Sequence, residues 1–394
     1  MVNVYRHSLC NISAISASSD PGRSRLFVKR RLQSRLLFPF KFNGKLRGSS
    51  GGAINDGPWI FWNGSLWADE IESTPLSTRG WVVQERFLTP RVLHFTENQI
   101  YWECLENECC EADPTGKFLI LAHASGSPKI VPTVYKKARL ELAKKRTDLA
   151  EGRSTDDTNV QFHTQWGDVV SLYANCALTK ESDRLIAMSG IAKTFQEANN
   201  DKYLAGLWKK VIYTNLTWTT NASDGAKVHR SKSYAPTWSW ASVTGGHKRL
   251  SMLHQRYSRL PNPLIKLVEE RIVTEPPGGD PTGLLRSAEL DIECLLYYYR
   301  WTADSSKLTV YTDEARTQCY FEKEKKPKDL HLDTTGLVQK FAEADEMEGV
   351  CVPLCGAYGG YGGGTNVYLM LEHDSGTRFK RIGVFEEGEI GHSQ

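Results

Sequence analysis

Residues 75–104 constrain the fold more than any other stretch of the chain, and they read PLSTRGWVVQERFLTPRVLHFTENQIYWEC. Pro90 must end any helix before it, because proline lacks an amide donor and disfavours helical backbone in the preceding residue. After it, RVLHF and IYWEC alternate apolar and polar residues around the four residues TENQ. The pattern predicts a helix that ends at Thr89, followed by a β-hairpin over 91–104 with a four-residue turn.

The predicted helix carries polar side chains beside an indole. Trp81 shares its face with Gln84 and Glu85. A carboxylate on a buried face needs a partner charge, so we expect Trp81 to be buried and Glu85 to form an ion pair with arginine. Ser77 or Thr78 is expected to cap the start of the helix. The nearby arginines are Arg79, Arg86 and Arg91.

The alternative interpretation of this cluster is chemical. Arginines beside Trp81 could bind an anion or a nucleotide, and Glu85 could act as an acid or base if burial raises its pKa. Glu103 is a weaker candidate, because a strand residue points away from its two neighbours, here Trp102 and Cys104. We favour a packed corner in which Trp102 is buried.

Composition divides the chain into four regions, and the fold class is mixed, α+β or α/β. Residues 1–135 contain the helix and hairpin block. Residues 136–160 are mostly charged and predict a solvated helix that runs into a linker. Residues 161–230 have helical spacing and predict a helical middle region, whereas residues 231–394 alternate as strands do and predict a β-rich C-terminal region.

Near the N-terminus, residues 10–17, CNISAISA, alternate as a short strand does, and a turn is predicted at 20–22. A lone strand leaves its backbone groups unpaired. It therefore pairs with a strand far along the chain, or its partner lies upstream. Residues 43–58 and 356–366 are rich in glycine and predict loops.

In the middle region, three apolar stripes at 166–173, 185–195 and 204–212 predict helices that pack as a small bundle. The segment TWSWASV that follows is predicted to be extended, with Trp238 and Trp240 on one face. The charged stretch 322–329 predicts a surface loop. Strands are predicted at 288–299, 306–312, 348–354, 366–372 and 378–385, with a hairpin turn at 372–377.

Charge and cysteine content limit the binding partners and the cellular compartment that we expect for this chain. The first 55 residues hold ten Lys and Arg against one acid, Asp20. A basic cluster can contact phosphates, and a basic, acid-poor start can resemble a transit peptide. The interleaved Leu, Phe and Val favour a partly buried segment instead, and no nucleic-acid partner is expected. No run reaches the ~20 apolar residues of a membrane span. Nine cysteines without framework spacing indicate free thiols and a cytoplasmic location.

Metal and cofactor sites are not predicted. Cys104 and the adjacent pair Cys109 and Cys110 could be completed by Cys351 and Cys355. Zinc sites use tight pairs separated by two to four residues, and an adjacent pair fits this badly. The glycine-rich stretch lacks the Lys-Ser/Thr ending of a phosphate-binding loop.

The block 75–104 strongly resembles the last block of the fungal heterokaryon-incompatibility (HET) domain. The family pattern is close to Pro-Leu-x-x-Arg-Gly-Trp-x-x-Gln-Glu-Arg, then Arg-x-Leu-x-Phe, then Trp-Glu-Cys. The positions filled here are Pro75, Leu76, Arg79, Gly80, Trp81, Gln84, Glu85, Arg86, Arg91, Leu93, Phe95, Trp102, Glu103 and Cys104.

The resemblance spans most of residues 1–260 and, more weakly, the C-terminus. Earlier blocks of the family do not occur in this sequence, so we expect an N-terminally truncated, partial HET-type α/β domain. The resemblance implies an effector or regulator of non-self recognition and programmed cell death in filamentous fungi, acting through other proteins. The alternatives are an NAD or nucleotide hydrolase of Toll/interleukin-receptor-like type, and an inert truncated fragment.

Overall fold

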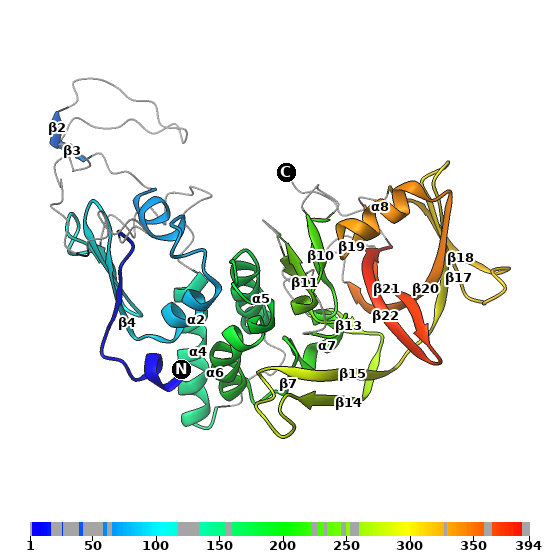
Figure 1. The fold of residues 1–394 in the computed structure, drawn as a ribbon, viewed down its shortest axis with the longest axis horizontal. Helices are drawn as coiled ribbons and strands as arrows, with labels where there is room; N and C mark the ends of the chain where they lie inside the picture. Colours follow the sequence, from blue (N-terminus) through cyan, green and yellow to red (C-terminus); the bar gives the residue numbers. More distant parts are fainter. Residues whose placement is uncertain are drawn as a thin grey trace. The chain divides into compact units, whose positions relative to one another are not determined.

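The computed structural model describes residues 2–16, 26, 39–41, 58–60, 65–116, 134–153, 160–222, 227–231, 235–245, 250–252, 260–326, 329–357 and 365–387. They belong to two compact units, residues 1–137 and 138–394 (Figure 1). The fold is a mixture of helices and several sheets, and the C-terminal region is rich in strands, as predicted. The predicted turn at 20–22 and most of the two glycine-rich stretches lie outside the described residues.

The main sheet of the first unit has four strands in the order β1, β4, β5, β6. β4 (Arg91–Phe95) and β5 (Ile100–Cys104) form the predicted hairpin with the predicted bounds. β6 (Glu108–Cys110) pairs antiparallel with β5. β1 (Asn11–Ser13) runs parallel to β4, so the N-terminal strand has its partner far along the chain. A separate ribbon joins β2 (Pro39–Lys41) to β3 (Pro58–Ile60).

The helix before the hairpin is α2 (Gly80–Leu88), and it ends as predicted, because Thr89 is extended. The predicted cap is wrong. Arg79 occupies the N-cap position and its side chain makes no capping bond. The hydroxyls of Ser77 and Thr78 donate to backbone carbonyl oxygens upstream of the helix instead. The other helices of this part are α1 (Val2–Arg6) and the π-helix η2 (Ala68–Glu72).

The charged region 136–160 is helical over most of its described length. α4 (Val134–Ala150) buries Ala138, Leu142 and Lys145, so one of its sides is packed. The aliphatic stem of a lysine can line an apolar surface while its ammonium finds a polar partner. The ammonium of Lys145 donates to Asn199 Oδ1 at 2.6 Å. The boundary between the two units falls inside this helix.

The helical part of the second unit confirms two of the three apolar stripes. α5 (Val160–Ala174) buries Trp166 and Tyr173, and α6 (Ser189–Asn199) buries Phe195. The short helices of this part are η3 (Glu181–Asp183), η4 (Ile186–Met188), η5 (Lys209–Val211) and α7 (Ile212–Asn215).

The third stripe, 204–212, is not a long helix, and the predicted three-helix bundle is wrong. β7 (Tyr203–Leu204) and β8 (Leu207–Trp208) form a tight hairpin. Its turn residues Ala205 and Gly206 have φ angles of 47° and 104°. A side chain at Gly206 would strike the Trp240 indole, because a Cβ there would lie 2.6 Å from Nε1. Positive φ and close contact together require the glycine.

The segment TWSWASV is not extended. Residues 235–239 form turns, and the 3₁₀ helix η7 (Trp240–Ser242) follows. Trp240 is fully buried and donates to Gly206 O at 2.8 Å, whereas Trp238 is half-buried, so the two indoles do not share a face. Short strands complete this part as two antiparallel pairs: β10 (Val228–Arg230) with β11 (Val243–Gly245), and β9 (Trp218–Thr220) with β12 (Leu250–Met252).

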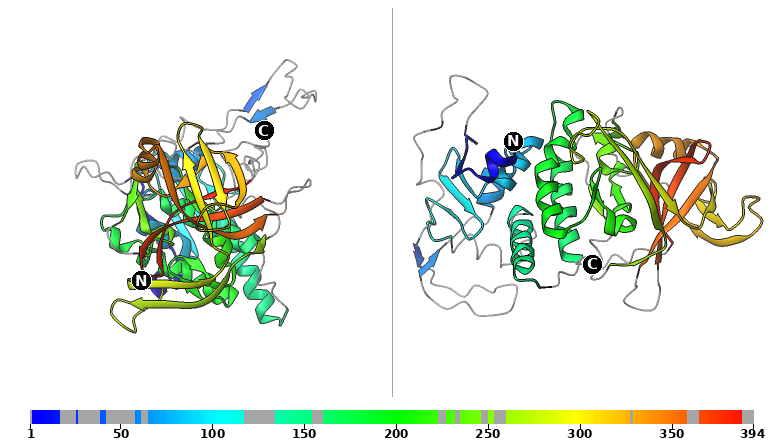
Figure 2. Two further views of the ribbon diagram at one scale, coloured as in Figure 1. Left: turned by 90° about the vertical axis from the view of Figure 1, so that its right-hand side faces the viewer. Right: turned by 90° about the horizontal axis from the view of Figure 1, so that it is seen from below.

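An eight-stranded sheet dominates the C-terminal region, in the order β18, β17, β16, β20, β21, β22, β19, with β13 beside β20. Figure 2 shows strong twisting, since its yellow and red strands cross steeply. The predicted loop at 322–329 is wrong in part, because 322–324 belong to β18. The strands are β13 (Asn262–Pro263), β16 (Tyr297–Thr302), β17 (Lys307–Tyr311), β18 (Cys319–Glu324), β19 (His331–Leu332), β20 (Glu346–Ala357), β21 (Thr365–Ser375) and β22 (Arg378–Glu386). A separate ribbon pairs β14 (Lys266–Thr274) with β15 (Leu285–Glu293).

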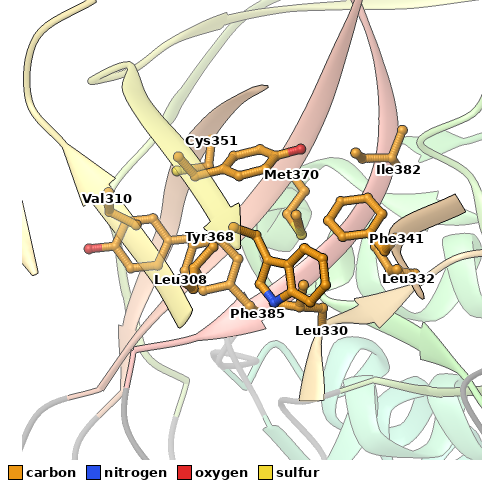
Figure 3. Close-up of a cluster of buried hydrophobic side chains, with 12 residues drawn as sticks. Leu308, Val310, Leu330, Leu332, Phe341, Cys351, Tyr368, Met370, Ile382 and Phe385 are labelled. Atoms are coloured by element: carbon orange, nitrogen blue, oxygen red, sulfur yellow. The ribbon is translucent and has the colours of Figure 1, made fainter. Parts of the chain in front are cut away.

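One helix, α8 (Thr335–Glu343), adds to the core of this sheet. The hydroxyl of Thr334 caps it by accepting from the Leu337 amide at 3.3 Å. Phe341 from α8 is fully buried among side chains from the strands (Figure 3). The cluster contains Tyr299, Trp301, Leu308, Val310, Leu330, Leu332, Phe341, Cys351, Tyr368, Met370, Ile382 and Phe385.

A buried arginine ties this sheet to the short strands of the same unit. Arg381 on β22 has a fully buried side chain that bonds Asp333 at 3.0 Å. Its guanidinium also donates to the carbonyl oxygens of Leu216 and Trp218 and lies 3.5 Å from the Trp218 ring centroid. Arg230 contacts the same carboxylate at 2.7 Å. The Asp333 charge is thereby shared between two guanidinium groups.

We predict that Asp333→Asn lowers the free energy of unfolding by about 3–5 kcal/mol, because it leaves Arg381 buried without a counter-charge. The measurement is denaturant unfolding followed by tryptophan fluorescence. Glu293→Gln is the matched control, since its ion pair with Lys266 is 68–75% exposed and such pairs contribute less than about 1 kcal/mol. Equal losses in both variants would contradict the prediction.

Candidate functional site

Three residues of the 75–104 block meet in the interior of the first unit. Arg86 from α2 donates through Nε to Glu103 Oε2 on β5 at 2.7 Å. His94 from β4 lies 3.0 Å from the same oxygen through Nε2. The three side chains are at most 5% exposed. This triad of guanidinium, carboxylate and imidazole is the candidate site.

The strand alternation explains why Glu103 and His94 share a face. In the register of the hairpin, His94 lies opposite Tyr101 and Glu103 lies opposite Val92. Side chains directly opposite each other in an antiparallel pair project to the same side of the sheet. All four are buried. Sequence reasoning missed His94, although the predicted hairpin already placed it on the face of Glu103.

Three predictions about burial and pairing are wrong. Trp81 on α2 is half-buried, and so is Trp102, because the buried face of the hairpin is the opposite one. Glu85 is not paired with arginine within the described part of the chain. Its partner is Tyr5, whose pKa is raised by burial and then by the charge of Glu85 and a hydrogen bond to it. The buried carboxylate that pairs with arginine is Glu103, which points away from Trp102 as expected.

The charges of the triad are fixed by its partners. Burial alone would raise the pKa of Glu103, but the Arg86 charge and the His94 hydrogen bond outweigh it and lower that pKa to about 2. The pKa of His94 is lowered, mainly by burial. An ionised carboxylate can only accept, so the neutral imidazole donates from Nε2. Its Nδ1 then remains an acceptor.

Aromatic rings enclose the triad. The Arg86 guanidinium lies 4.4 Å from the ring centroid of Tyr135 and 5.8 Å from that of Trp67. Trp67 also meets His94 edge to face at 5.9 Å. Within the described residues, Arg86 Nη2, His94 Nδ1 and Glu103 Oε1 have no hydrogen-bond partner. The triad is therefore enclosed by aromatic rings, with three polar atoms that lack a partner among the described residues.

This arrangement suits positioning better than proton transfer. A carboxylate with a pKa near 2 is a weak base at neutral pH, and a general base works best when its pKa lies near the working pH. Glu103 is also 1% exposed. The triad links α2 to the hairpin, so it fixes the orientation of both elements.

The remaining residues of the block are spread around this centre. Gly80 and Gln84 are buried on α2. Arg79 is exposed, and Arg91 is exposed with Nη1 3.5 Å from Leu9 O. Cys104 is half-buried and its sulfur accepts from the Asn107 amide at 3.2 Å. The structure therefore brings Arg86 and Glu103 together and leaves the other motif side chains apart from them.

A second polar network lies at the turn of the hairpin, and sequence reasoning missed it. Glu70 from η2 accepts from the Thr96 hydroxyl at 2.8 Å and from Asn98 Nδ2 at 3.1 Å. Gln99 Nε2 donates to the Tyr101 hydroxyl at 2.8 Å. Polar turn residues facing an acidic helix were the available signal. The network holds the four-residue turn in place.

Metal ligation and membrane insertion receive no support from the described ranges. Among those residues, no group of three or more His, Cys, Asp or Glu side chains could hold a metal ion. None of the helices described is both long enough and apolar enough to cross a membrane. Neither a protein-family model, nor a curated protein, nor a solved structure matches this chain.

The triad predicts an acid-sensitive first unit. The pKa of His94 is lowered from 6.5 on folding, so below pH 6.5 the unfolded chain binds a proton that the folded chain does not. Stability should therefore fall as the pH drops through this range. Glu103 adds a second loss, which starts below 4.5 and continues toward about 2.

His94→Gln keeps an N–H donor for Glu103 but does not titrate. We expect its urea midpoint to change less between pH 7.5 and 5 than that of the parent. His229→Gln is the control, because its imidazole is 66% exposed. If the two variants show the same pH dependence, the assignment of the loss to His94 is wrong.

Proposed function

We propose that this chain is an effector or regulator of non-self recognition and programmed cell death in filamentous fungi, and that it acts in the cytoplasm through contacts with other proteins. The HET-type pattern filled by residues 75–104 supports this assignment. The buried pair of Arg86 and Glu103 gives two of those pattern residues a structural role. The first unit is then a HET-type α/β domain in part.

The outer face of the four-stranded sheet is the surface proposed for these contacts. Ile12, Leu93, Trp102 and Cys109 lie opposite one another across β1, β4, β5 and β6 and form a row. Ile12 is 58% exposed, and the other three are half-buried. Aromatic residues flanked by apolar ones are typical anchors of protein interfaces. This row is the single observation that favours a contact function over a buried active site.

The growth of a filamentous fungus that overexpresses the chain tests the proposal. We expect growth arrest with the parent protein. We expect Trp102→Asp to relieve the arrest, because a charge in the apolar row opposes docking. Tyr320→Asp is the control, since this tyrosine is an exposed aromatic, 45% accessible, in the second unit.

Each outcome needs equal protein levels and a cooperative thermal transition in both variants. Arrest that persists in Trp102→Asp would show that the row does not carry the contact. A parent protein that never slows growth would contradict the proposed function itself.

The nucleotide-hydrolase alternative predicts that the purified chain consumes NAD, whereas the contact function does not. We expect the purified chain to leave NAD unconsumed, because Glu103 is buried and ionised. The measurement is NAD concentration over time, compared with a buffer blank. Consumption that is lost in Glu85→Gln or Glu103→Gln, with the fold retained, would favour the enzyme over the contact protein.

A further inference from the structure

The large sheet of the second unit opens between two neighbouring strands. β20 and β21 pair from Val350 opposite Leu371 onward. On the other side of this point, the described pairings join Gly349 to Tyr299 on β16 and His373 to Phe379 on β22. The two strands therefore separate, and each follows a different neighbour.

A hollow of about 340 Å³ lies where the strands separate. Its walls come from Met347 and Gly349 on one side and from Leu371 and Phe379 on the other, with Leu337 of α8 beside them. Pockets for small molecules have volumes of roughly 300–1,000 Å³ and mostly apolar walls. Phe379 at the rim is 38% exposed, so the hollow has an apolar entrance.

Tyr299 supplies the hollow with one unused polar group. Its side chain is 1% exposed and lines the hollow. Its hydroxyl makes no hydrogen bond with a described residue, and it is not one of the enclosed polar atoms that lack a partner, so it faces the open space of the hollow. A tyrosine hydroxyl next to an apolar wall can bond the polar group of a ligand. Gly349 makes room for this ring, because a Cβ at that position would lie 2.6 Å from the hydroxyl oxygen.

Three of the charged side chains that line the hollow have ion-pair partners. Lys340 bonds Glu372 at 3.3 Å. Glu348 bonds Arg300 at 2.7 Å and Arg316 at 3.3 Å. A charged ligand would have to displace these ion pairs or lose its hydration against the apolar walls, and either is costly. A neutral ligand avoids this cost.

We propose that this hollow binds a neutral, mostly apolar small molecule that presents one hydroxyl or carbonyl oxygen to Tyr299. The site is distinct from the triad of the first unit and does not depend on the proposed contact function. Binding gives the hydroxyl a direct partner in place of solvent and removes the apolar walls from water.

Binding of naphthalene-2-methanol to the full chain tests the ligand class, with saturation-transfer NMR as the measurement. The controls are 2-naphthoate and 2-naphthylmethylammonium, which have the same ring and opposite charges. We expect the neutral alcohol to bind at least about tenfold tighter than either ion, because ions pay for lost hydration. Equal or tighter binding of an ion would overturn the neutral assignment.

Two pairs of variants test the position of the site. Leu337→Trp fills the hollow and should abolish binding, whereas Gln339→Trp, on the same helix but outside the lining, should not. Tyr299→Phe removes the hydroxyl and should weaken binding about three- to tenfold. Tyr297→Phe on the same strand is its control, because Tyr297 does not line the hollow.

The tyrosine pair keeps the test valid if the tryptophan variant fails to fold. Weaker binding of naphthalene-2-methanol in Tyr299→Phe, with parent-like binding in Tyr297→Phe, supports the proposal. Parent-like binding in both Leu337→Trp and Tyr299→Phe, or no detectable binding of the neutral alcohol to the parent, would overturn it.

Discussion

A guanidinium that leaves water needs a carboxylate beside it, and both units are built around this requirement. In the first unit, Arg86 on α2 pairs with Glu103 on β5. In the second, Arg381 on β22 pairs with Asp333. Such a pair adds little net stability over apolar packing, but breaking it is costly. Each pair therefore acts mainly by excluding alternative arrangements, since any rotation of a helix or slip of a strand would separate the two charges.

Local chemistry made the hairpin of the first unit predictable, but the choice of its buried face was not. Pro90 and the four residues TENQ fixed the end of α2 and the bounds of both strands. Alternation also separated Glu103 from Trp102. A pattern of period two groups side chains by face without saying which face is inside. Apolarity favoured the face of Trp102, whereas the ion pair with Arg86 places Glu103 inside.

Local pattern also failed at the third apolar stripe of the middle region, residues 204–212, which was predicted to be a helix. Leu204, Leu207 and Trp208 have helical spacing, but a short apolar run fits a helix and a strand equally well. Contacts far away in the sequence decide between them. The indoles of Trp166 and Trp240 both donate to Gly206 O, at 3.2 Å and 2.8 Å. These bonds hold the carbonyl of the turn in a conformation that no helix allows, and no local signal in the sequence reports them.

The two units differ in which of their groups are available to bind other molecules. In the first, Glu103 and Arg86 neutralise each other in the interior, so these charges hold a helix on a hairpin. The surface that we propose for recognition is the apolar row of Ile12, Leu93, Trp102 and Cys109. In the second, Arg381 is fully committed to Asp333 and to backbone carbonyls. Tyr299 lines the hollow where the sheet opens, and this is where we propose that a small ligand binds.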